Sequence, residues 1–118
     1  MGSIEAVRYL TRHGTRRVGK LVLAAPTTPF LSVPLGALLA CRRTVAAADT
    51  RAELARLDLP TLILQGDKDA SAPLPLTGVK TAKLIKGSKL VVYEGAPHGL
   101  VFTHRERFLS DVVAFIAT

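Results

Sequence analysis

Two short apolar runs, each followed by a turn with ionisable side chains, constrain this chain more than any other feature. Both lie within residues 61–99. The first run, LIL, is followed by Asp67 and Asp69, and the second, LVV, is followed by His98. A helix-like segment separates them, and strands that alternate with helices predict parallel neighbours. Because the carboxyl ends of parallel strands meet at one edge of a sheet, we expect an acid and His98 to lie together there.

An acid beside a histidine is the arrangement that orients an imidazole as a general base. Each residue also has a simpler interpretation. Aspartate favours turns because of its own local hydrogen bonds, and a histidine that follows Pro97 can be an ordinary surface-loop residue. The pattern therefore predicts a base-orienting pair and leaves open whether Asp67 or Asp69 supplies the acid.

The size and composition fit a small globular domain. The chain has 118 residues, 48% of them hydrophobic, and carries no low-complexity tract, which argues against disorder. No apolar run approaches the roughly 20 residues of a membrane span. The first ten residues lack the order of a signal peptide, so we expect a cytoplasmic protein without a membrane association. Cys41 is the only cysteine, which excludes an internal disulfide, and it is expected in the core.

The formal net charge of +7 raises the possibility of an acidic partner, such as nucleic acid. The basic residues are spread along the chain, however, and lysines at three-residue spacing are typical of a solvated helix face. Aromatic residues make up only 5% of the chain, too few for a platform on which bases stack. We therefore expect no nucleic-acid binding, with a basic module for acidic partners as an alternative. The two basic clusters are Arg12, Arg16, Arg17 and Lys20, and Lys80, Lys83, Lys86 and Lys89.

Hydrophobic periodicity predicts an α/β protein of three parallel strands flanked by helices. Asp49 or Thr50 is expected to cap a short turn at residues 51–57. The last helix is expected to bury one stripe, formed by Phe108, Val112, Phe115 and Ile116. The predicted strands are residues 19–25, 59–65 and 89–93, and the predicted helices are residues 2–13, 35–47, 76–85 and 102–117.

Three longer segments resemble a known family. Residues 65–74 (QGDKDASAPL), 91–104 (VVYEGAPHGLVFTH) and 5–26 (EAVRYLTRHGTRRVGKLVLAAP) are similar to the C-terminal half of an α/β-hydrolase. The closest likeness is to the cofactor-free haloperoxidase (perhydrolase) and aryl-esterase branch. The resemblance implies a single partial domain over residues 1–118, with half of the family's doubly wound sheet. Residues 26–57 would form a shortened cap or connection region, so no full cap is expected.

The resemblance also assigns roles at the site. It implies that Asp69 is the triad acid, that Asp67 caps the turn, and that His98 is the general base. The substrate would be a small carboxylic ester, and some members of the branch make peracids. No cofactor or metal is implied, and the expected roles of His13 and His104 are at helix ends rather than as metal ligands.

The family's nucleophile is a serine in a glycine-x-serine-x-glycine elbow, and this chain has no such motif. The resemblance places Met1 immediately after that serine, so we expect a chain truncated just after the nucleophile. The backbone N–H of Met1 would then help to form the oxyanion hole. Ser3 is the candidate substitute nucleophile, although a helix cap or helix surface is its simpler role. Ser71, in the acid loop, is expected to serve the turn.

Half a sheet would leave unpaired groups, so we expect a homo-oligomer. The contact could be edge pairing at residues 21–25, where a strand would have lost its neighbour. Alternatively, helix 2–13 could pack through Ile4, Val7 and Leu10. A catalytically impaired fragment that acts as an oligomer or binds a partner chain is the alternative to an active esterase.

Overall fold

The structure is a computed structural model, and it describes residues 2–26 and 49–118. The predicted helix at residues 35–47 and Cys41 lie outside the described residues. The described elements are α1 (Gly2–His13), β1 (Leu21–Ala24), α3 (Arg51–Leu54), β2 (Thr61–Gly66), α4 (Gly78–Leu84), β3 (Lys89–Tyr93), α5 (Leu100–Thr103) and α6 (Arg105–Ala117).

The three strands form one parallel sheet in the order β1-β2-β3. Leu21 pairs with Thr61 in the first ladder, and Leu62 pairs with Lys89 in the second. This confirms the predicted α/β class and the three parallel strands. The third strand has the predicted bounds, whereas the first is shorter than predicted and the second begins two residues later and ends one residue later.

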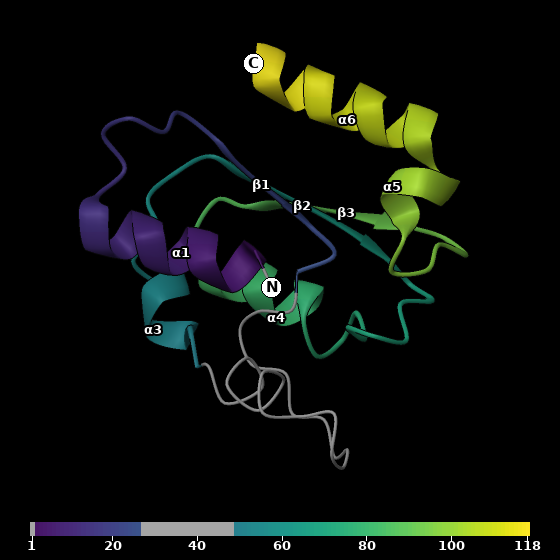
Figure 1. Cartoon of the computed structure of the whole chain (residues 1–118), viewed down its shortest axis with the longest axis horizontal. Helices are drawn as coiled ribbons and strands as arrows, with labels where there is room; N and C mark the ends of the chain where they lie inside the picture. Colours follow the sequence, from purple (N-terminus) through teal and green to yellow (C-terminus); the bar gives the residue numbers. More distant parts are fainter. Residues whose placement is uncertain (1, 27–48) are drawn as a thin grey trace.

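Helices cover both faces of the sheet (Figure 1). The central strand β2 is buried along its whole length, because alternate side chains enter two separate hydrophobic clusters. On one face, Ile63 packs with residues of α1, β1 and the α3 region; on the other, Leu62 and Leu64 pack beneath α6. The buried members of the first cluster are Val7, Leu10, Leu21, Leu23, Leu54, Leu57, Ile63 and Ile85, and those of the second are Leu62, Leu64, Tyr93, Ala96 and Leu100.

The apolar stripe of α1 lies inside this fold. Ile4, Val7 and Leu10 are all buried, and the last two pack with β1 and the α3 region. The prediction that these three side chains mediate an oligomer contact is therefore wrong. The helical periodicity identified the buried face of α1 correctly, but the chain's own strand and its short helix α3 cover that face.

The C-terminal segment differs from the prediction, because two helices replace the single helix at residues 102–117. His104 separates them with φ −127° and ψ 38°, which is outside the helical region. The predicted stripe of α6 is also narrower. Phe108, Val112 and Phe115 pack on the sheet, whereas Ile116 is 60% exposed. Its side chain lies on the flank of the helix rather than on its inner face.

Polar contacts fix α6 over the sheet at its C-terminus and at its middle. Lys20 donates from Nζ to the backbone oxygens of Phe115 (2.7 Å) and Ile116 (3.0 Å), which places a cation at the negative C-terminus of the helix. At the middle of the helix, the hydroxyl of Tyr93 donates to Asp111. Burial, together with that hydrogen bond, raises the pKa of Tyr93, so its hydroxyl remains a donor at neutral pH.

The short helix α3 is capped by the first of the two predicted residues. Asp49 Oδ1 accepts the backbone N–H of Arg51 at 3.0 Å, while Thr50, at the N-cap position, makes no side-chain cap hydrogen bond. The hydrogen bond from the Arg51 side chain lowers the pKa of Asp49 to about 2. The carboxylate is therefore charged, as the N-terminus of a helix favours.

Candidate active site

The loops that follow β2 and β3 are joined to each other by backbone hydrogen bonds. The N–H of Asp67 donates to the Tyr93 oxygen, and the N–H of Lys68 donates to the Ala96 oxygen, both at 3.1 Å. In return, the Gly95 N–H donates to Asp67 Oδ1 at 2.7 Å. The two loops thus form one rigid unit at the carboxyl edge of the sheet.

Asp69 lies within this unit as a fully buried carboxylate. Its Oδ1 atom accepts the backbone N–H groups of Ser71 (3.0 Å) and Ala72 (2.7 Å). Its Oδ2 atom lies 2.7 Å from Nδ1 of His98. Three donors therefore surround a carboxylate that has no contact with water, which fixes its orientation.

This contact determines the tautomer of His98. A carboxylate only accepts hydrogen bonds, so Nδ1 must carry the proton that lies between the two side chains. In the neutral ring, Nε2 then has a free lone pair. The His98 side chain is 47% exposed, so a molecule at the surface can reach the ring. The arrangement can accept a proton at Nε2 while Asp69 stabilises the imidazolium that forms.

Sequence comparisons identify relatives that are named as esterases, perhydrolases or haloperoxidases. The chain is 41% identical over 63 residues to a bifunctional esterase/perhydrolase of Acinetobacter calcoaceticus, and this match takes in 53% of the chain and 23% of the relative. A non-heme chloroperoxidase of Kitasatospora aureofaciens is 35% identical over 78 residues, with 64% of this chain and 28% of that protein matched. A Synechocystis relative, named provisionally as a non-heme chloroperoxidase, is 29% identical over 91% of this chain and 60% of its own length.

Solved structures show the same fold. A bromoperoxidase of Bacillus anthracis matches all of this chain and 65% of its own chain with a TM-score of 0.85 at 24% identity. An esterase of Exiguobacterium antarcticum matches 98% of this chain and 63% of its own with a TM-score of 0.84 at 23% identity. No protein-family model matches.

The chain has the α/β-hydrolase fold, and its relatives are named as haloperoxidases and esterases. It spans 60% of the Synechocystis relative and about a quarter of the other two. The Synechocystis alignment runs over 167 residues, more than the 118 of this chain. That relative therefore has segments with no counterpart in this chain.

The structure brings together Asp69 and His98, as the parallel-strand pattern predicts, and their catalytic roles stay predictions. Asp67 was predicted to cap its own turn. Its Oδ1 atom instead accepts the Gly95 N–H of the histidine loop, so its side chain joins the two loops. Ser3 lies in the first turn of α1. Because α1 runs antiparallel to the strands (Figure 1), this turn is on the side of their carboxyl ends. Met1 lies outside the described residues.

The two remaining histidines occupy helix ends, as predicted. His13 is the last residue of α1, and His104 joins α5 to α6, with its Nδ1 2.8 Å from the hydroxyl oxygen of Thr103. Among residues 2–26 and 49–118, no group of three or more histidine, cysteine, aspartate and glutamate side chains is arranged to hold a metal ion. Within the same ranges, no helix is long and apolar enough to cross a bilayer.

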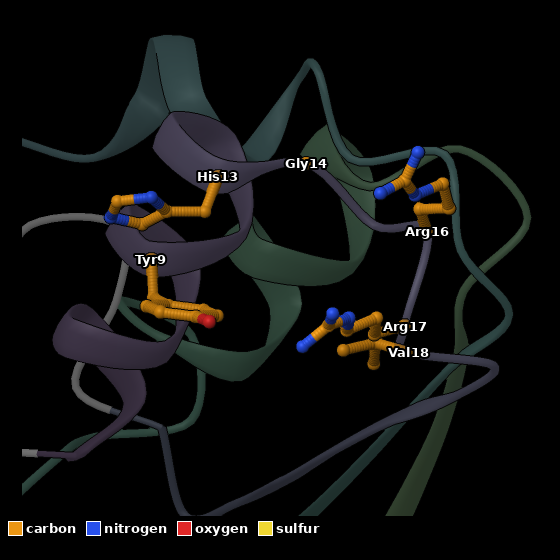
Figure 2. Close-up of a pocket in the computed structure, with 6 residues that line it drawn as sticks. All are labelled: Tyr9, His13, Gly14, Arg16, Arg17 and Val18. Atoms are coloured by element: carbon orange, nitrogen blue, oxygen red, sulfur yellow. The ribbon is translucent and has the colours of Figure 1, made fainter.

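A hollow lies at the C-terminal end of α1, near the amino ends of the strands. It has an empty volume of about 410 Å³. Figure 2 shows Arg17 directed toward Tyr9 and Arg16 directed away from it. The two arginines therefore do not converge on one point, and the C-terminal carbonyls of α1 oppose an anion there. We assign no site to this hollow, which is lined by Tyr9, His13, Gly14, Arg16, Arg17 and Val18.

Sequence reasoning missed one side chain near the site. Gln65 is completely buried in β2, immediately before the acid loop. The signal was available, because a single amide directly follows the apolar run Leu62–Leu64 of a buried strand, and buried polar groups require partners.

Proposed function

We propose that this chain takes part in the hydrolysis of small carboxylic esters, with His98 as the general base and Asp69 as the residue that orients it. The observation that carries the proposal is the 2.7 Å contact between His98 Nδ1 and Asp69 Oδ2, with the carboxylate buried and the imidazole accessible. The esterase and perhydrolase names of relatives support the substrate class. Peracid formation from a short acid and peroxide is the related reaction of the same site.

The proton moves between the nucleophile and the leaving group. Nε2 of His98 accepts a proton from the hydroxyl that attacks the ester carbonyl, and the imidazolium then protonates the departing alkoxide. Where the nucleophile is a side-chain hydroxyl, the acyl group stays on its oxygen; a water molecule that gives a proton to Nε2 then attacks this acyl group, and the carboxylic acid leaves as the imidazolium returns the proton to the side-chain oxygen. Where the nucleophile is water, the carboxylic acid is released directly. The candidate nucleophiles are Ser3, a hydroxyl from a neighbouring chain, and a water molecule activated directly by His98.

Replacing His98 with alanine should lower the rate of p-nitrophenyl acetate hydrolysis by about 10²-fold, the lower end of the contribution of one general base. The matched control is His13→Ala, which removes an exposed imidazole at the far end of α1 and should leave the rate unchanged. Equal rates for the wild type and His98→Ala would exclude the proposed function. Mass spectrometry after mixing with substrate tests the nucleophile, since attack by Ser3 adds one acetyl group to the residue.

We also propose that the chain forms a homo-oligomer, the second candidate role, because within residues 2–26 and 49–118 β1 pairs on one side only. Leu21 and Ala25 donate their N–H groups to the β2 side, at Pro60 and Leu64. In a parallel ladder, the backbone groups of the intervening residues point the other way. The backbone N–H and C=O groups of Val22 therefore point away from β2, where a further strand could bind them.

An apolar flank of α6 lies on the same side as that edge. This flank consists of the exposed residues Leu109, Val113 and Ile116. Each of them directly follows a residue of the stripe that packs on the sheet. Arg107 and Asp111, on the opposite flank, contact Tyr93 of β3. The exposed apolar flank must then face the side of β1, so a second copy could cover both the edge and the flank.

The oligomer proposal predicts that the wild-type chain has at least twice the mass of one chain by light scattering at micromolar concentration. Val22→Pro should reduce this to the mass of one chain, because proline removes an outward N–H and is tolerated on an edge strand. Gly19→Ala, just before β1 and without neighbouring atoms to disturb, is the control. A wild-type mass equal to one chain would contradict the proposal.

A further inference from the structure

Gln65, in β2, is hydrogen-bonded to the loop that carries Asp69. Its side chain is buried in β2, and its Nε2 atom donates hydrogen bonds to the Ala72 oxygen and to Thr77 Oγ1, the second at 2.8 Å. The Thr77 hydroxyl, in turn, lies 3.1 Å from the same Ala72 oxygen. One buried amide and one buried hydroxyl therefore converge on a single carbonyl of the loop.

That carbonyl belongs to the residue that also binds Asp69. The Ala72 N–H donates to Asp69 Oδ1 at 2.7 Å, and the Ala72 oxygen accepts from Gln65. Ala72 is thus held through both of its backbone groups, one by the strand beneath the loop and one by the acid. The other oxygen of Asp69 contacts His98. A continuous series of hydrogen bonds leads from β2 to the imidazole.

We infer that Gln65 is a positioning residue for the Asp69–His98 pair. It fixes the Ala72 backbone so that its N–H is directed at Oδ1, which leaves Oδ2 pointing at His98. The catalytic meaning of this role rests on the proposed function, whereas the structural coupling does not. Gln65 itself is separated from the reacting atoms by the loop.

The Oε1 atom of the Gln65 amide also supports this assignment. Gln65 Oε1 is buried without a hydrogen-bond partner, and such an orphan acceptor destabilises the fold by roughly 1–3 kcal/mol. A methionine would fill the same space without that penalty. The orientation of the amide is fixed, because the Ala72 carbonyl can only accept and must face Nε2. The donor half of Gln65 therefore has a role that an apolar core residue could not perform.

The first residue of α4 packs directly against the Gln65 amide. A Cβ atom on Gly78, the first residue of α4, would lie 2.1 Å from Gln65 Oε1. A side chain at this position would therefore displace the buried amide of Gln65. The amide, the loop and the start of α4 form one packed unit beneath Asp69.

The test compares Gln65→Met with the wild type by NMR. We expect the Ala72 amide to exchange with solvent about tenfold faster, and the downfield Nδ1–H resonance of His98 to weaken or move upfield, because the loop is no longer held. Where hydrolysis is measurable, kcat should fall while KM stays constant. Thr61→Val is the matched control, since Thr61 lies in the same strand as Gln65 and its buried hydroxyl donates to the Leu59 oxygen, before the strand, rather than to the loop. Thr61→Val should leave both NMR readouts unchanged.

A second variant keeps the inference testable if Gln65→Met does not fold. Thr77→Val keeps the shape of the side chain and removes the hydroxyl that accepts from Gln65 Nε2 and lies 3.1 Å and 3.0 Å from the Ala72 and Pro73 oxygens. It should therefore accelerate the exchange of the same amide to a smaller extent. Unchanged amide exchange and an unchanged His98 resonance in the folded variants would overturn the inference. Altered NMR readouts, together with equal ester hydrolysis by the wild type and His98→Ala, would retain the positioning role and exclude the hydrolase.

Discussion

Replacing Gly66 with alanine is expected to destabilise the chain by about 3 kcal/mol, the upper end of the range for an overpacked site. The new Cβ would lie 2.0 Å from the Ala96 oxygen and 2.6 Å from the Ala96 carbonyl carbon. Both atoms belong to backbone, so no side-chain rotation can relieve the contact. The Ala96 oxygen also accepts the Lys68 N–H, and moving it would separate the two loops.

The effect of Gly66→Ala on the site should be as clear as its effect on stability. His98 lies two residues after Ala96, so displacing that loop carries the imidazole away from Asp69. Urea unfolding followed by circular dichroism measures the loss of stability, and the Nδ1–H resonance of His98 measures the separation of the pair. Gly19→Ala is the matched control, because no atom lies within 4 Å of its new Cβ. Equal stabilities of the two variants would contradict the close approach of the loops.

The close approach at Gly66 explains why the site was only partly predictable from the sequence. The sequence could indicate that Asp69 and His98 meet, because this follows from the direction of parallel strands alone. It could not indicate that Asp67 would bind Gly95, because that contact depends on how closely two loops pack. The role of Gln65 was missed for the same reason, since its partners come from a loop whose path no local pattern specifies.

The boundaries and buried faces of the helices and strands were also predictable only where a local sequence signal determines them. Glycines with positive φ at residues 87 and 95 lie on either side of β3, and such residues mark turns that can be recognised in a sequence. Nothing comparable marks the boundary between α5 and α6, since residues 100–117 contain no proline or glycine. The apolar stripe of α1 was recognised, but its periodicity says which face is buried and not which element covers it.

Leu64→Ala is the second substitution with a large expected effect, a loss of about 3–5 kcal/mol. Leu64 is fully buried in β2 beneath α6 and packs in the cluster that contains Tyr93 and Leu100. The helix is fixed above it by Lys20, so the surroundings cannot collapse into the cavity. For a domain whose total stability is about 5–15 kcal/mol, this loss removes a large share. Chemical unfolding of the purified chain measures it directly.

The matched variant, Ile116→Ala, tests what covers α6 in solution. Ile116 is exposed on the flank of the helix, so in a single chain its replacement should change stability by no more than about 0.5 kcal/mol. In an oligomer that buries this flank, the same replacement should cost more than 1 kcal/mol and make unfolding depend more weakly on protein concentration. A costly Leu64→Ala with a neutral Ile116→Ala would therefore indicate a chain that folds alone, whereas two costly substitutions would locate the oligomer contact on the side of β1.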